Sequence, residues 1–163
     1  MSTTAADSGP APEPSEPQSS QPAQQPAVHQ RRFPGLASQI KHARTFVARC
    51  VGDIPELTTA VLLTSEVATN AVTHTNSGHS GGKFEVTVRV GRRWLRVEVR
   101  DLGSGQTPQA MHRKPHDVHE HGRGLDLVAA LATRWEAELR ADGLGHIVWF
   151  ELTWDADATD DAA

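Results

Sequence analysis

The order of apolar and polar positions divides the chain into helical and extended segments. Apolar residues recur every three or four positions over residues 36–51, and this spacing predicts an amphipathic helix that Gly52 ends. Asp53 and Pro55 then offer a capping residue and an early-turn proline for a second helix. Because no Gly or Pro interrupts the apolar run that follows, we expect this second helix to continue to about Thr75.

Apolar and polar residues then alternate over residues 84–90 and again over 95–100, which predicts two antiparallel strands joined by a short turn. Residues 102–120 show no periodicity, and so long a loop inside a compact domain is typical of a functional lid. A third helix is predicted to open at residues 121–124, and further strands are predicted at 135–139 and 147–154.

Helices and strands occur in blocks, not in strict alternation, so the expected fold class is α+β. This class implies a two-layer α/β sandwich with helices on one face of a mostly antiparallel, mixed sheet. Residues 1–30 are rich in Pro, Ser, Ala and Gln and are predicted to be disordered, while the acidic residues 155–163 are predicted to fray. We therefore expect one domain, residues 31–154, between two tails.

Charge and composition narrow the expected partners and compartment. The net charge is −4 without any basic cluster, which argues against nucleic acid as a direct partner, because binding to phosphates needs clustered Lys and Arg. No apolar run reaches the ~20 residues that span a bilayer, and no signal-like segment opens the sequence. The single cysteine, Cys50, excludes an intramolecular disulfide. We expect a soluble, cytoplasmic protein without membrane contact.

Three polar residues stand out in the second helix, in the sequence LLTSEVATNAVTH. At ~100° per residue, Glu66, Asn70 and His74 form one polar stripe beside an apolar face. A carboxylate, a carboxamide and an imidazole could bind a ligand. A solvated helix face with an i,i+4 hydrogen bond would show the same pattern, so the stripe alone does not identify a site.

A first glycine motif, DLGSG, begins at Asp101, where a buried strand is predicted to end. A carboxylate at this place can accept a hydrogen bond from an exocyclic amine. Gly103 and Gly105 let the backbone approach a flat ring such as adenine. An ordinary turn, in which the aspartate caps its own backbone, would use the same residues.

A second glycine motif opens the third predicted helix. Gly122 and Gly124 flank Arg123, and the backbone N–H groups of a helix start, aided by the helix dipole, can bind phosphate. Arg123 could add a charge-assisted contact. A plain glycine-rich helix entry is the alternative.

Taken together, the three motifs contain the groups needed to hold Mg–ATP. Asn70 can provide one oxygen ligand to Mg²⁺, which keeps most of its waters and asks for few protein ligands. Glu66, one turn earlier, would lie near the phosphates, where it could orient or deprotonate an attacking hydroxyl. Asp101 would accept the adenine amine. The predicted cofactors are ATP and Mg²⁺.

EVATNAVTH, DLGSG and GRGL, in this order, resemble the N-box and the two glycine boxes of the GHKL superfamily of ATP-binding domains, whose fold is the Bergerat α/β sandwich. The short chain, the Phe33-Pro34-Gly35 start and the VWFEL strand are similar to anti-sigma-factor serine/threonine kinases of the partner-switching type. The resemblance covers about residues 33–154. It implies site roles for the following residues: Glu66 as the catalytic N-box acid, Asn70 as the Mg²⁺ ligand, Asp101 as the adenine-binding carboxylate, Gly103 and Gly105 in the first glycine box, and Gly122, Arg123, Gly124 and Leu125 in the second.

The resemblance also implies an activity and partners. In this family the γ-phosphate of ATP passes to a serine or threonine of an antagonist, the anti-anti-sigma protein, and the kinase alternatively sequesters a sigma factor. Relatives suggest a homodimer. An ATP-binding interaction module that transfers no phosphate is the alternative, and Glu66 argues against it. The catalytic half of a histidine kinase is disfavoured, because Pro-rich residues 1–30 cannot form a helical phosphoacceptor region.

Two segments depart from the family pattern. The predicted lid carries four histidines, whose imidazoles suit transition metals, but it has no Cys and no fixed geometry, so a solvated lid is favoured: His112, His116, His119 and His121. The last strand is preceded by Gly145-His146 instead of a Gly-Thr pair. The family's threonine contact near adenine therefore has no match in this chain.

Overall fold

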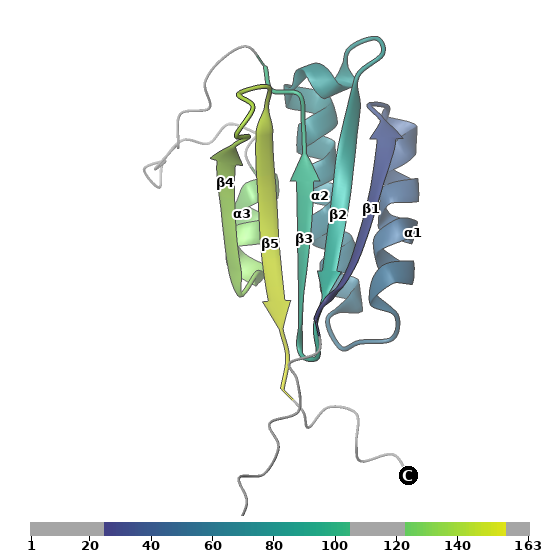
Figure 1. Ribbon diagram of the computed structural model, residues 1–163, viewed down its shortest axis with the longest axis vertical. Helices are drawn as coiled ribbons and strands as arrows, with labels where there is room; N and C mark the ends of the chain where they lie inside the picture. Colours follow the sequence, from purple (N-terminus) through teal and green to yellow (C-terminus); the bar gives the residue numbers. More distant parts are fainter. Residues whose placement is uncertain (1–24, 105–122, 156–163) are drawn as a thin grey trace, which may run out of the picture.

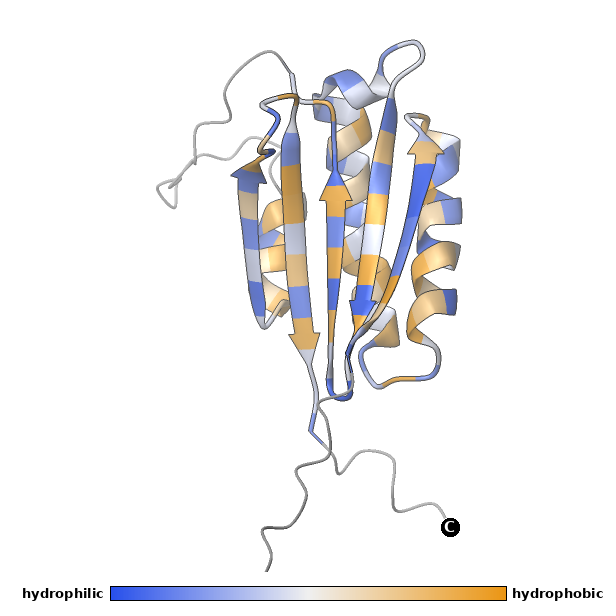
Figure 2. Cartoon of the chain, in the orientation of Figure 1, coloured by the Kyte–Doolittle hydropathy of each residue, from blue (hydrophilic) through white to orange (hydrophobic). Residues whose placement is uncertain are grey.

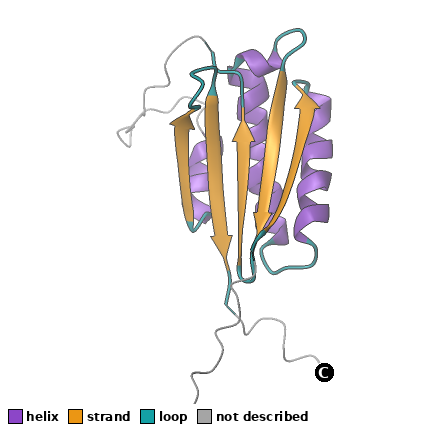
Figure 3. Cartoon of the chain, in the orientation of Figure 1, coloured by secondary structure: helices purple, strands orange, loops and turns teal. Residues whose placement is uncertain are grey.

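The computed structural model describes residues 25–104 and 123–155, which form a sheet covered on one face by helices (Figure 1). The helices are α1 (Ile40–Val51), α2 (Leu57–His74) and α3 (Arg123–Leu131), with short 3-10 turns η1 (Ala37–Gln39) and η2 (Asn76–Gly78). The strands are β1 (Ala27–Pro34), β2 (Lys83–Val90), β3 (Trp94–Arg100), β4 (Arg134–Leu139) and β5 (His146–Thr153), and they lie in the order β1-β2-β3-β5-β4. Figure 3 shows the two layers, with the helices behind the sheet.

Alternation along the strands decides which face of the sheet meets the helices (Figure 2). In β3, Leu95, Val97 and Val99 are buried beneath the helices, whereas the residues between them are partly exposed on the outer face. Outer positions are largely charged and form ion pairs along neighbouring strands, such as Glu98 with Arg89 and Arg96, each at 3.3 Å. One face is therefore a hydrophobic core and the other a network of charges.

The apolar stripe of α2 packs on the centre of the sheet. Leu63, Val67 and Ala71 are buried in the core cluster, together with the inward residues of β2 and β3. Thr75 ends the helix, because its hydroxyl donates to the Ala71 carbonyl at 2.6 Å and accepts from the Ser77 N–H at 3.1 Å. The chain then turns directly toward the upper end of the sheet in Figure 1.

The predicted α+β sandwich with helices on one face is confirmed, and two details of the sequence prediction are wrong. The sheet is not mixed, because each of the four strand pairings in the described residues is antiparallel. Strand β1 begins at Ala27, inside the segment 1–30 that was expected to be disordered. Only Phe33 of β1 is buried, so this edge strand is held by backbone pairing with β2 and lacks an apolar alternation.

Residues 1–24 and 156–163, and most of the predicted lid, lie outside the described residues. Over the ranges that the structure does describe, no helix combines the length and the apolar character needed to cross a membrane. Cys50 is a free thiol on α1, and partial burial raises its pKa above the ordinary value.

Candidate functional site

Asp101 follows the last residue of β3 and is buried there. Its backbone N–H donates to the His146 carbonyl at 2.9 Å, which extends the pairing of β3 with β5 by one residue. Its carboxylate oxygen Oδ1 accepts from the N–H groups of Gly103, at 2.7 Å, and His146, at 3.0 Å. The other oxygen, Oδ2, accepts no hydrogen bond from the described residues, so it is the oxygen that can accept one from a ligand.

The loop after Asp101 is joined to the end of α2. The N–H of Leu102 donates to the buried hydroxyl of Ser77 at 2.9 Å, and the N–H of Asn76 donates to the Gly103 carbonyl at 2.5 Å. Both acceptor and donor lie in η2, immediately after α2. These hydrogen bonds bring the first glycine box and the C-terminal end of the polar-stripe helix to the same edge of the sheet (Figure 1).

Glu66 and Asn70 lie one turn apart in the C-terminal half of α2, and both are half-buried. Neither side chain forms a hydrogen bond or an ion pair with residues in the described ranges. They flank the buried stripe of α2, and α2 packs against both β3 and α3. A half-buried carboxylate and carboxamide that make no polar contact within the described part of the chain can bind a ligand.

The second glycine box is placed only in part. Arg123 and Gly124 begin the backbone of α3, and Leu125 is half-buried in its first turn. Gly105 and Gly122 lie outside the described residues. The structure therefore brings Asp101, Gly103 and the end of α2 together, and it places α3 beside α2. Residues 105–122, which connect the first glycine box to α3, are not among the described residues.

Sequence reasoning missed the part that Gly145 and His146 play beside Asp101. The ring nitrogen Nδ1 of His146 lies 3.2 Å from Asp101 Oδ1, and the Asp101 side chain is buried while that of His146 is partly buried. Gly145 has a φ of +154° and passes so close to the Asp101 carbonyl that no side chain fits. The missing Gly-Thr pair marked these two positions as unusual, but only the fold shows what they contact.

Gly145→Ala is expected to destabilise the domain by about 2 kcal/mol or more, because it combines backbone strain with a steric clash. A Cβ at this position would lie 2.1 Å from the Asp101 carbonyl oxygen and 2.8 Å from the Gly103 nitrogen. Gly143→Ala is the matched control, since Gly143 also has a positive φ, +70°, but a Cβ there meets nothing within 4 Å. Thermal unfolding should show a larger loss for Gly145→Ala, and equal losses would contradict this packing.

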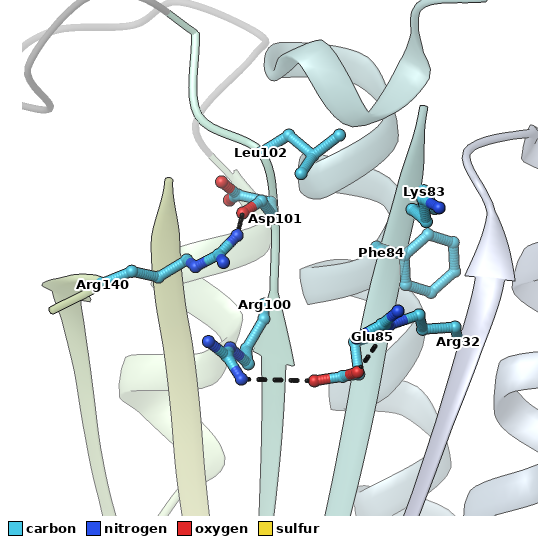
Figure 4. A pocket seen from close by; sticks show the side chains of 8 residues that line it. All are labelled: Arg32, Lys83, Phe84, Glu85, Arg100, Asp101, Leu102 and Arg140. Carbon is cyan, nitrogen blue, oxygen red and sulfur yellow. Dashed lines mark hydrogen bonds and ion pairs between the residues drawn. The ribbon is translucent and has the colours of Figure 1, made fainter. Parts of the chain in front are cut away.

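A depression of about 220 Å³ lies beside Asp101 on the outer face of the sheet (Figure 4). Glu85 is central to it, and its carboxylate accepts from Arg32 at 2.9 Å and Arg100 at 3.4 Å. Neither Glu66 nor Asn70 lines this depression. Asp101 and Leu102 line it together with charged residues of the outer face, so it adjoins the Asp101 end of β3 without reaching Glu66 or Asn70.

Arg140 ties the end of β4 to the end of β3. Its Nη1 donates to the Asp101 carbonyl at 3.1 Å, and its Nη2 pairs with the Asp142 carboxylate. The backbone N–H of Leu144, followed by the Arg140 side chain, lowers the pKa of the Asp142 carboxyl below its ordinary value. These contacts fix the backbone that carries the Asp101 carboxylate.

The side-chain oxygens of Asn70 and Asp101 suit a nucleotide better than a transition metal. No group of three His, Cys, Asp or Glu side chains is clustered in the described part of the chain, and the four histidines of the predicted lid lie outside it. Asn70 offers a single hard oxygen, which fits Mg²⁺ shared with phosphates. The Oδ2 atom of Asp101 fits an exocyclic amine.

The family comparison agrees with this geometry. Residues 33–152 match the histidine kinase-like ATPase domain family, a match that begins in β1 and ends in β5. No curated protein matches the sequence. Since the family match covers well over half of the chain, including α2, the end of β3 and α3, the chain belongs to the histidine kinase-like ATPase family, within the GHKL superfamily of ATP-binding domains.

Proposed function

We propose that this protein binds Mg–ATP and transfers the γ-phosphate to a serine or threonine of an anti-anti-sigma antagonist protein. We also propose that, when it is not bound to the antagonist, the domain binds and sequesters a sigma factor. The kinase and partner assignments rest on the resemblance of the three sequence motifs to partner-switching kinases, and the family match supports the ATP-binding part.

One observation carries the nucleotide part of the proposal. Asp101 is buried at the end of β3 with Oδ1 held by its own chain and Oδ2 left for a ligand. Oδ2 accepts no hydrogen bond from the described residues, and an exocyclic amine could donate one to it. An adenine that donates to Oδ2 would lie against Gly103, at the edge that α2 also reaches. Asp101 would thereby set the identity of the base.

Residues of α2 would then act on the other end of the nucleotide. Bound Mg²⁺ neutralises charge on the phosphates, and the Asn70 amide oxygen would be one of its ligands. Glu66 would accept the proton of the attacking serine or threonine hydroxyl as the new O–P bond forms. The bond from the γ-phosphorus to its bridging oxygen breaks, so the products are ADP and a phosphorylated antagonist.

The direct test is to incubate the full chain with γ-labelled ATP, Mg²⁺ and candidate antagonist proteins. Label on a serine or threonine of an antagonist, identified by mass spectrometry, is the expected result. If the chain binds ATP but labels no candidate, the protein is an ATP-binding interaction module. If it binds no ATP, the nucleotide part of the proposal is wrong as well.

Asn70→Ala is expected to remove most of the dependence of ATP binding on Mg²⁺. The parent protein should bind ATP more tightly with Mg²⁺ than with a chelator, because the metal links Asn70 to the phosphates. Calorimetric titrations of both proteins, each with and without Mg²⁺, measure this difference. Thr69→Ala, at an exposed position of the same helix, is the control and should keep the parent behaviour. A full Mg²⁺ effect in Asn70→Ala would place the metal elsewhere.

A further inference from the structure

The histidine that precedes the last strand has a defined place beside the proposed base site. His146 begins β5, and its backbone N–H already donates to Asp101 Oδ1. Its ring adds a second contact, with Nδ1 at 3.2 Å from the same oxygen. The imidazole is 12% exposed and the carboxylate side chain 8%, so this contact is shielded from water.

The ring also packs against the first glycine box. A Cβ built on Gly103 would lie 3.7 Å from Cε1 of His146, so the ring occupies the space beside this glycine. Gly103 itself donates to Asp101 Oδ1 at 2.7 Å. Two backbone N–H donors, with the His146 ring nitrogen beside them, therefore surround one carboxylate oxygen.

The chemistry of the pair sets the tautomer of the ring. A carboxylate has no proton to give, so a hydrogen on Nδ1 makes the 3.2 Å contact with Asp101 Oδ1 attractive, whereas a lone pair on Nδ1 would make it repulsive. In a neutral ring this leaves Nε2 without a proton. The two backbone donors and the ring contact act on Oδ1 and restrain the torsion of the carboxylate, and Oδ2 accepts no hydrogen bond from the described residues.

We infer that His146 is a positioning residue for base recognition, which orients Asp101 so that Oδ2 accepts a hydrogen bond from the 6-amino group of a purine. This inference rests on the proposed nucleotide site and adds the determinant of its base selectivity. A base with a 6-oxo group in place of the amine presents a lone pair to Oδ2 and is rejected. Weaker orientation of the carboxylate lowers this discrimination.

The test compares two replacements of the same side chain in the full-length protein. In His146→Asn, the side-chain amide nitrogen is bonded to Cγ, as Nδ1 is, so it can still donate to Asp101. His146→Leu keeps similar bulk without a donor. His29→Leu, at an exposed position of β1, is the control for loss of an imidazole. The probes are ATP and inosine triphosphate, which differ at position 6 of the base, and affinities are measured by calorimetry with Mg²⁺.

The parent is expected to prefer ATP to inosine triphosphate by about tenfold or more. His146→Leu should lower the ATP affinity, and with it this preference, by about fivefold, the effect of one hydrogen bond. His146→Asn and His29→Leu should stay within about twofold of the parent ratio. An unchanged ratio in His146→Leu overturns the inference, because a purely structural role would weaken both nucleotides equally. A parent that binds neither nucleotide overturns the proposed function and the inference together.

A second measurement covers the case in which His146→Leu does not fold. Nitrogen-15 NMR of histidine rings at pH 8, where an ordinary imidazole is neutral, distinguishes the two tautomers. The His146 signal, assigned by its absence in His146→Asn, should show a proton on Nδ1. A proton on Nε2 instead would rule out donation to Asp101 and so overturn the inference.

Discussion

Replacing Glu66 with Gln is expected to reduce phosphate transfer to an antagonist about 100-fold or more while ATP affinity stays within about twofold. Glutamine keeps the shape of the side chain but cannot take a proton, and general-base catalysis contributes ~10²–10⁴ in rate. Glu66 forms no hydrogen bond or ion pair with the described residues, so the change breaks no such contact among them. Initial rates with labelled ATP and a calorimetric affinity separate the two effects.

Glu56→Gln is the matched control for this prediction. Glu56 is also half-buried, at the start of α2, ten residues before Glu66 and thus about 15 Å away along the helix axis. It should transfer phosphate at the parent rate. If Glu66→Gln transfers as fast as the parent, Glu66 is not the base, and the polar stripe of α2 serves another purpose.

Replacing Asp101 with Asn is expected to weaken ATP binding by about 10- to 150-fold, the loss of one hydrogen bond to a charged group. Asparagine can keep its Oδ1 toward the N–H groups of Gly103 and His146, so the loop should stay folded. Its amide nitrogen would then face the amine of adenine, which places a donor against a donor. Asp101→Ala is less informative, because it also leaves two buried N–H groups without an acceptor.

Calorimetric titration with Mg–ATP measures the effect, and thermal unfolding confirms that the variant is folded. Asp53→Asn is the control, since Asp53 is exposed in the connection between α1 and α2, at the far end of α2 from Asp101. If Asp101→Asn binds Mg–ATP as tightly as the parent, adenine does not bind to Asp101. The outer-face depression would then become the next place to look.

The parts of the fold that depend on local pattern were predictable from the sequence. Helices α1 and α2 and strands β2 and β3 have strong periodicities, and their antiparallel pairing follows from the short turn between the two strands. Strand β1 was missed because it is an edge strand with one buried side chain. β1 is held by backbone hydrogen bonds to β2, and such hydrogen bonds do not require an apolar pattern in the sequence of β1.

The candidate site was predictable only as separate motifs. The spacing of Glu66 and Asn70 shows that they are neighbours on one helix. The loop after Asp101 is joined to the end of this helix by a hydrogen bond from the Leu102 N–H to the Ser77 hydroxyl, 25 residues away in sequence. His146 meets Asp101 across 45 residues. No local pattern encodes such contacts, because they arise when β3 and β5 pair. The roles of the site residues remain predictions.

The most direct test of a single Mg–ATP site at this edge is to follow backbone amides by NMR during titration of the full-length protein with Mg–ATP. Chemical-shift changes should be largest at Gly103, His146 and Asn70 and should saturate. The three titration curves should give the same dissociation constant for Mg–ATP. Shifts confined to the outer-face depression around Lys83 and Arg100, or shifts at Gly103 without any at Asn70, would contradict a common site.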